Sequence, residues 1–206
     1  DFNMSGGTLT RGGTPGATSV AAVNFSGTAV QAFTKSGGTI SNAINFTIMN
    51  NAKVDFGTSV LSGSNGTFAL AAGGKIITAN ANGLGAAGSV QMARTYSSQA
   101  DYEFQGPATG VFTTSIPNTV RDLIVNNSVN GGDVILDQVL NVTRTLNLTE
   151  GMITTTAHLL TIGAAGNATA PTPTSFVNGL LAKTGNTAFT FPVGKAGEGY
   201  PTIVIG

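Results

Sequence analysis

Asp101 and Glu103 are the acidic residues whose spacing best suits chemistry. They lie two residues apart in Asp101-Tyr102-Glu103-Phe104, so on a β-strand both carboxylates project from one face about 7 Å apart. That separation is compatible with acid–base work on a glycosidic bond. However, Tyr102 and Phe104 alternate with them as ordinary core residues, and Arg94 is the only base within ten residues of the pair. We therefore expect a solvated outer strand face, without a catalytic role.

A second motif suggests nucleotide binding. Gly83-Leu84-Gly85-Ala86-Ala87-Gly88 has the glycine spacing of a dinucleotide-binding turn, and Glu103 lies twenty residues beyond Gly83. Such a turn must open a helix, because the helix N-terminus holds the phosphates. Ser89-Val90-Gln91-Met92 instead has the pattern of a strand. The motif therefore predicts a glycine-rich corner between strands.

Two further groups could bind a metal ion. Gly131-Gly132-Asp133 with Asp137 offers oxygen ligands for calcium, but two acids are few and the motif does not repeat. His158 is the only histidine and has no cysteine near it, so we expect a surface or corner residue. The sequence thus predicts no catalytic residue, no metal ligand and no cofactor, and we do not expect an enzyme.

The composition sets limits on partners. The 206 residues include 9 Lys+Arg and 9 Asp+Glu, which gives a formal net charge of zero. Nucleic acids and anionic membranes both need clustered bases, so neither is an expected partner. No run approaches the roughly 18 apolar residues of a membrane span, and no membrane insertion is expected. Threonine, serine and asparagine together make up nearly a third of the chain, a neutral polarity that is typical of proteins outside the cell.

Eight Asn-x-Ser/Thr triplets also occur, and glycan attachment to them is possible. The simpler interpretation is an outward strand face made of neutral polar residues. The triplets begin at Asn3, Asn24, Asn45, Asn65, Asn126, Asn141, Asn147 and Asn167.

The elements that position these residues are predicted to be β-strands. Glycine, threonine, serine and asparagine interrupt every apolar helical period, whereas short alternating segments recur. Examples are Ile44–Ile48, Val54–Phe56, Tyr102–Phe104, Leu140–Thr143 and Leu146–Thr149.

The spacing of the strands favours a solenoid over hairpins. Two interleaved series of apolar segments share one step of about 18 residues, and three short strands per step suit a β-solenoid. The first series is Leu123–Asn126, Leu140–Thr143 and Leu159–Ile162, and the second is Val134–Leu136 and Met152–Thr154. We predict an all-β, right-handed parallel β-helix over residues 1–206, with roughly nine coils of about 18–27 residues and no globular catalytic domain.

Inward positions of such a solenoid form its core. The expected core residues are Phe25, Phe46, Phe56, Phe104, Leu140, Val142, Leu146, Leu148, Ile153 and Leu160.

The apolar end of the sequence, Thr202–Gly206, has no charged or helical cap. We therefore expect a fragment of a longer repetitive protein, or one that stacks on another copy.

Four stretches of the sequence have a phrasing typical of repeat regions. They are Lys75–Asn80 with Gly83-Leu84-Gly85, Ala100–Gly106, Ile116-Pro117 through Asp122–Asn127, and Ser175–Lys183 with Phe189–Gly194. These stretches resemble the repeat regions of giant surface proteins that Bacteroidota export through the type IX secretion system. That resemblance implies an extracellular, adhesin-like protein whose coils form a stalk.

Three functions are therefore open. The preferred one is a structural and adhesive surface fibre, which serves as a rigid stalk for gliding, predation or general attachment. The alternative is a secreted carbohydrate-binding or polysaccharide-degrading β-helix, with Asp101, Tyr102 and Glu103 facing a groove. The third, compatible with the first, is a homo-multimeric filament, favoured by the near-zero charge. The partners expected are copies of the chain, neighbouring repeats, and a target cell or solid surface.

Overall fold

The protein is an all-β solenoid of parallel strands in the computed structural model. The structure describes residues 1–12, 20–106, 111–112, 115–127, 133–201 and 203–205. Across these ranges no α-helix is present. The predicted fold class is confirmed, with about seven full turns in place of the nine expected. One reason is the length of the first turn, which separates Phe2 from its register partner Phe33. This turn contains more residues than any later turn of the same sheet, so fewer turns fit into the chain.

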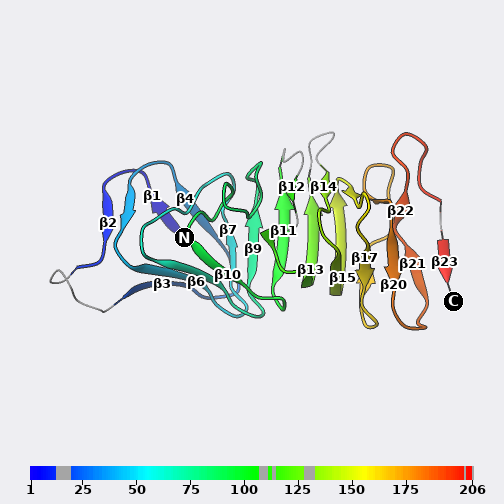
Figure 1. Ribbon diagram of the computed structural model, residues 1–206, viewed down its shortest axis with the longest axis horizontal. Helices are drawn as coiled ribbons and strands as arrows, with labels where there is room; N and C mark the ends of the chain where they lie inside the picture. Colours follow the sequence, from blue (N-terminus) through cyan, green and yellow to red (C-terminus); the bar gives the residue numbers. More distant parts are fainter. Residues whose placement is uncertain (13–19, 107–110, 113–114, 128–132, 202, 206) are drawn as a thin grey trace.

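One long sheet connects nearly all the turns (Figure 1). Every pairing in it is parallel, so each strand bonds to the strand of the turn before and the turn after. In order across the sheet the strands are β1 (Phe2–Met4), β4 (Val30–Lys35), β7 (Lys53–Asp55), β9 (Lys75–Thr78), β11 (Asp101–Gln105), β13 (Thr119–Asn126), β15 (Leu140–Glu150), β17 (Leu160–Ile162) and β20 (Leu181–Lys183), with β18 (Asn167–Ala168) also pairing β15.

Shorter sheets form the other faces. The first contains β3 (Ala21–Phe25), β6 (Ile44–Ile48), β8 (Thr67–Leu70) and β10 (Ala93–Tyr96), and the second β12 (Val111–Phe112), β14 (Val134–Ile135), β16 (Ile153–Thr154), β19 (Val177–Asn178) and β22 (Val193–Gly194). A third pairs β2 (Thr8–Thr10) with β5 (Thr39–Ser41), and a fourth β21 (Phe189–Phe191) with β23 (Ile203–Ile205).

The register of the long sheet differs from the step expected from the sequence. Leu123 pairs with Leu146, and Leu140 pairs with Leu160, so both steps are longer than expected. The two segments expected at Leu140–Thr143 and Leu146–Thr149 are parts of the single strand β15. β15 bonds to β17 through its first residues and to β18 further along, so it passes from one face to the next. Leu123 and Leu140 therefore occupy different positions in their respective turns, and the spacing between them is shorter than one turn.

The core is a column of stacked apolar side chains. All ten residues predicted for it are buried. An aromatic row runs along its N-terminal half, with neighbouring ring centroids 4.6 to 6.2 Å apart. Such ring pairs add to the free energy gained from burial alone. The row consists of Phe2, Phe33, Phe56, Phe68, Tyr96 and Tyr102.

Asparagine and glycine make the corners between strands. Asn42, Asn51 and Asn65 adopt φ values of 61 to 64°, a region that asparagine tolerates better than most residues. At Gly66 an added Cβ atom would lie 2.0 Å from the carbonyl oxygen of Ile44. Only glycine therefore permits the close approach of these two turns.

The last strand departs from the parallel pattern. β23 pairs antiparallel to β21, with Thr190 opposite Val204. Its three side chains are all exposed, including Val204. The strand-forming character expected for Thr202–Gly206 is confirmed for Ile203–Ile205, the part of that segment that the structure describes. However, β23 folds back on β21 instead of adding a parallel rung.

We predict a loss of stability at high pH that depends on two tyrosines, Tyr102 in the core and Tyr96 packed against it. Burial raises the pKa of Tyr96, partly offset by the charge of Arg94, and raises that of Tyr102. Both stay protonated in the folded state, while the unfolded chain loses their protons near pH ~10. Stability is therefore fully present below about pH 10 and falls above it, by up to about 1.4 kcal/mol per pH unit for each tyrosine.

Urea denaturation at a series of alkaline pH values measures this dependence. The single variants Tyr96→Phe and Tyr102→Phe should each flatten the decline, because phenylalanine has no proton to lose. A decline of unchanged steepness in both variants would show that these side chains are not responsible.

Candidate functional site

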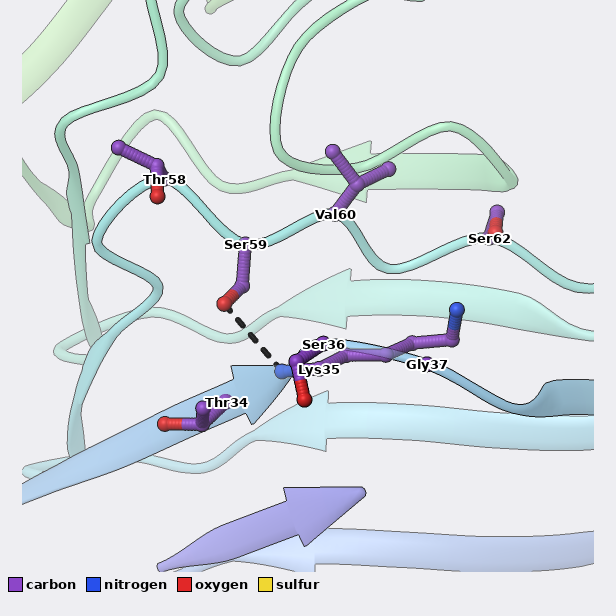
Figure 2. A pocket seen from close by; sticks show the side chains of 8 residues that line it. All are labelled: Thr34, Lys35, Ser36, Gly37, Thr58, Ser59, Val60 and Ser62. Atoms are coloured by element: carbon purple, nitrogen blue, oxygen red, sulfur yellow. Dashed lines mark hydrogen bonds between the residues drawn. The ribbon is translucent and has the colours of Figure 1, made fainter. Parts of the chain in front are cut away.

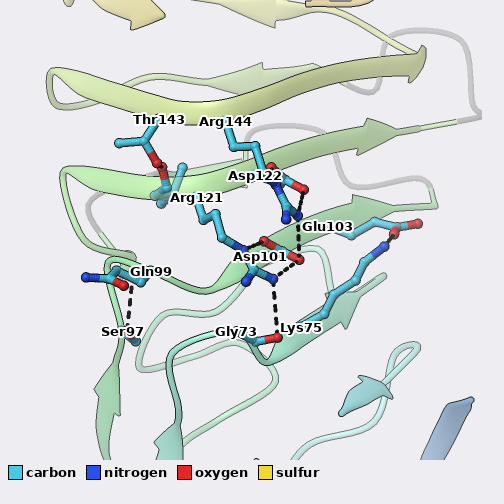
Figure 3. Close-up of polar contacts among 11 residues, drawn as sticks. Gly73, Lys75, Ser97, Gln99, Asp101, Glu103, Arg121, Asp122, Thr143 and Arg144 are labelled. Atoms are coloured by element: carbon cyan, nitrogen blue, oxygen red, sulfur yellow. Dashed lines mark hydrogen bonds and ion pairs between the residues drawn. The ribbon is translucent and has the colours of Figure 1, made fainter. Parts of the chain in front are cut away.

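Six charged residues form one cluster on the outer face of the long sheet, along strands β9 to β15 (Figure 3). Alternation within β11 turns Tyr102 and Phe104 into the core, as predicted, and sends Asp101 and Glu103 outward. We call this set the ion cluster: Lys75, Asp101, Glu103, Arg121, Asp122 and Arg144.

Asp101 and Arg121 form the centre of the ion cluster. The Nε and Nη2 atoms of Arg121 donate to the two carboxylate oxygens of Asp101, each at 2.7 Å. This two-pronged arrangement is the strongest geometry for such a pair. The Nη2 atom of Arg121 also donates to the carbonyl oxygen of Gly73 at 3.2 Å. The hydrogen bond with Asp101 raises the pKa of Arg121 above its ordinary value, so the guanidinium stays charged.

Arg144 extends the ion cluster by one turn. It donates from Nε to one carboxylate oxygen of Asp122 at 2.8 Å and from Nη2 to the other. The same Nη2 atom lies 3.5 Å from the carboxylate of Asp101. The hydrogen bond with Asp122 raises the pKa of Arg144. Both arginines lie where the register shifts between β13 and β15.

Glu103 is held by a separate contact within the ion cluster. The ammonium of Lys75, one turn earlier on β9, forms an ion pair with Oε2 of Glu103. The side-chain amide of Gln105 donates to Oε1 at 3.1 Å. Both carboxylate oxygens of Glu103 are therefore engaged, as are both oxygens of Asp101.

The expectation of a solvated face is wrong for these two acids. Asp101 and Glu103 are each only 8% exposed. The reason is that Lys75 and the arginines come from neighbouring turns, which are distant in the sequence. Tyr102 does not face a groove as the carbohydrate alternative required. It is fully buried, and its hydroxyl donates to the carbonyl oxygen of Ser97 at 2.6 Å. The ion pairs of Asp101 and Glu103 therefore connect neighbouring turns of the solenoid.

The glycine motif forms a compact loop, as predicted. Its amides bond within the loop: Gly88 donates to Gly85 at 3.0 Å and Gly83 to Asn80 at 2.8 Å. A Cβ atom at Gly88 would lie 2.1 Å from the carbonyl oxygen of Gly83. The glycines therefore serve close backbone packing. The chain then makes a single bridge at Val90, and the strand expected at 89–92 begins instead at Ala93.

The calcium candidate falls partly outside the described residues, which exclude Gly131 and Gly132. Burial raises the pKa of Asp133, and its Oδ2 accepts a hydrogen bond from Thr154 at 3.0 Å. Within the described ranges no group of three or more His, Cys, Asp or Glu gathers as a metal site would. His158 lies in the turn between β16 and β17, a corner position as predicted.

The Asn-x-Ser/Thr triplets lie on the outer surface. All eight asparagines are partly or fully exposed. Seven are on strands, as expected for an outward polar face, and Asn65 occupies a corner. The triplet at Asn126 extends to Ser128, outside the described residues.

Comparisons with protein-family models, with curated proteins and with solved structures found no match. In the described part of the chain, no helix is long and apolar enough to cross a membrane.

We predict that the ion cluster stabilises the fold more than an exposed ion pair does. Arg121→Met leaves the carboxylate of Asp101 without its main partner, at a cost of between about 1 and 3 kcal/mol. The matched control is Glu198→Gln, which removes the partner of Lys195 in a pair whose side chains are 68% and 65% exposed. That change should cost at most about 0.5 kcal/mol.

Urea denaturation of the two variants measures both costs. The double variant Arg121→Met, Asp101→Asn should recover part of the loss, because no charge is then left unpaired. Equal effects of Arg121→Met and Glu198→Gln would contradict the assignment.

Proposed function

We propose that this chain is a segment of a structural, adhesive fibre on the outside of a bacterial cell, in which the solenoid serves as a rigid stalk. The observation that carries the proposal is the long parallel sheet. From β1 to β20, backbone hydrogen bonds join each turn to the next along the axis of the molecule (Figure 1). A load applied to the two ends acts on many of these bonds together.

Side-chain contacts between turns support the same role. The aromatic row and the ion cluster both run along the axis, and each connects at least three turns. At the C-terminal side, the ammonium of Lys183 donates to the carbonyl oxygens of Gly163 and Ala164, both at 2.8 Å. Because each turn contacts its neighbours on both sides, the loss of one turn weakens the next.

The outer surface also supports the proposal of a fibre that contacts other surfaces or other copies of the chain. Register stacks small, uncharged side chains into rows that run along the axis on two faces of the solenoid. With a net charge of zero, copies of the chain do not repel one another. A multimeric filament is therefore part of the proposal. The rows are Asn24, Thr47, Ala69 and Thr95 on one face, and Thr119, Asn141, Thr161 and Ala182 on another.

The extracellular location and the link to type IX-secreted adhesins rest on the resemblance of the repeat segments. A neutral polar surface, rich in threonine and asparagine, agrees with that location. The catalytic form of the carbohydrate alternative is less well supported, because the carboxylates of Asp101 and Glu103 are bound by neighbouring cations.

Single-molecule pulling tests the stalk. The chain is held between handles joined to its two ends. We expect it to keep its length under load and then to open in abrupt steps, because inter-turn bonds break cooperatively. A variant with Leu160→Asp, which buries an unpaired carboxylate in the core, should lengthen at much lower load. Smooth extension of the unaltered chain, like that of an unstructured linker, would refute a load-bearing role.

A further inference from the structure

A polar groove lies between two neighbouring turns in the N-terminal half of the solenoid (Figure 2). One wall is the end of β4 with the residues after it, Thr34–Gly37, and the other is the irregular stretch Thr58–Ser62 beyond β7. The groove has a volume of about 440 Å³. This is within the size range of small-ligand sites.

The groove exists because the ladder between β4 and β7 ends early. The last paired residues are Ala32 and Asp55. Beyond them the second wall bonds to the following turn: the amide of Phe56 donates to Ile77 at 2.9 Å, and that of Leu61 to Ser89 at 2.7 Å. The amide of Lys35 donates instead to the hydroxyl of Ser59 at 3.2 Å. Backbone pairing therefore leaves this gap between the turns open.

The first wall is fixed by the turn before it. The amide of Ser36 donates to the carbonyl oxygen of Met4 at 3.0 Å. A Cβ atom at Gly37 would lie 2.5 Å from the carbonyl oxygen of Ser5, and Gly38 has a φ of +76°. The glycines thus allow the wall to pack against the earlier turn. The groove is preformed, so a ligand need not organise it.

The lining combines hydroxyl groups with one positive charge. Thr34, Ser36, Thr58 and Ser62 bring hydroxyls that can both donate and accept. Lys35 brings an ammonium, and Figure 2 shows its side chain extended along the groove toward Ser62. The eight lining residues include no carboxylate and no aromatic ring. Among the ion pairs seen in the described ranges, none engages Lys35.

We propose that this groove binds an acidic saccharide, a sugar unit that carries a carboxylate beside its hydroxyls. The carboxylate would meet the ammonium of Lys35, and the sugar hydroxyls would exchange hydrogen bonds with the threonine and serine side chains. A neutral pyranose gains much of its binding from stacking on an aromatic ring, and this lining offers none. The inference goes beyond the stalk, since the groove binds whether or not the chain bears load.

Titration with trigalacturonate, followed by amide chemical shifts, tests the site. We expect shifts confined to residues 34–37 and 58–62 and their immediate neighbours. Lys35→Gln should weaken binding about tenfold or more, because a hydrogen bond to a charged group is lost. The matched control Lys53→Gln removes the same charge from the exposed Lys53 on strand β7 and should leave the affinity unchanged. Thermal denaturation confirms that both variants are folded.

Three results would overturn the proposal. They are equal binding by Lys35→Gln and the unaltered chain, shifts located elsewhere, and equal binding of neutral maltotriose. Acetate provides a further arm: if it binds as tightly as the trisaccharide, the groove is a simple anion site and the sugar specificity is wrong. All of these readouts are independent of the pulling experiment, so the groove and the stalk succeed or fail separately.

Discussion

Parallel backbone pairing between successive turns is the interaction on which the rest of this structure depends. Stacked strands lie about 4.8 Å apart, so the register between them determines which side chains meet along the axis. In the core it brings Phe2 over Phe33. On the outside it brings Asp101 next to Lys75 on one side and Asp122 on the other. The core, the ion cluster and the rows of neutral side chains all follow from this one constraint.

The same constraint explains what the sequence predicts and what it does not. Alternation within one strand is a local property, so Ile44–Ile48 and the inward Tyr102 and Phe104 were predicted correctly. The partners of Asp101 were not predicted, because Arg121 and Arg144 reach it only through register. A comparison of residues about one turn apart in the sequence would identify Arg121 as a partner of Asp101.

Register itself was harder to predict, for a physical reason. Strand β15 passes from one face of the solenoid to the next, and irregularities in its pairing with β13 lie between Val120 and Asp122 and again between Val125 and Asn126. An extra residue at such a point changes the step without changing the local apolar pattern. The groove beside Lys35 has a similar origin, since it opens where pairing stops at Asp55. Interruptions of the ladder thus create the features that differ from a uniform stalk.

Disulfide cross-linking tests the central claim most directly, because the chain contains no cysteine. Asn141 and Thr161 are register partners on adjacent turns, whereas Ala182 lies one turn further along the same row. Mild oxidation should join the pair Asn141→Cys, Thr161→Cys rapidly. It should leave Asn141→Cys, Ala182→Cys largely open, since bridged Cα atoms lie within about 7 Å. Equal cross-linking of the two pairs in the folded chain, or none in the first, would contradict parallel stacking of the turns.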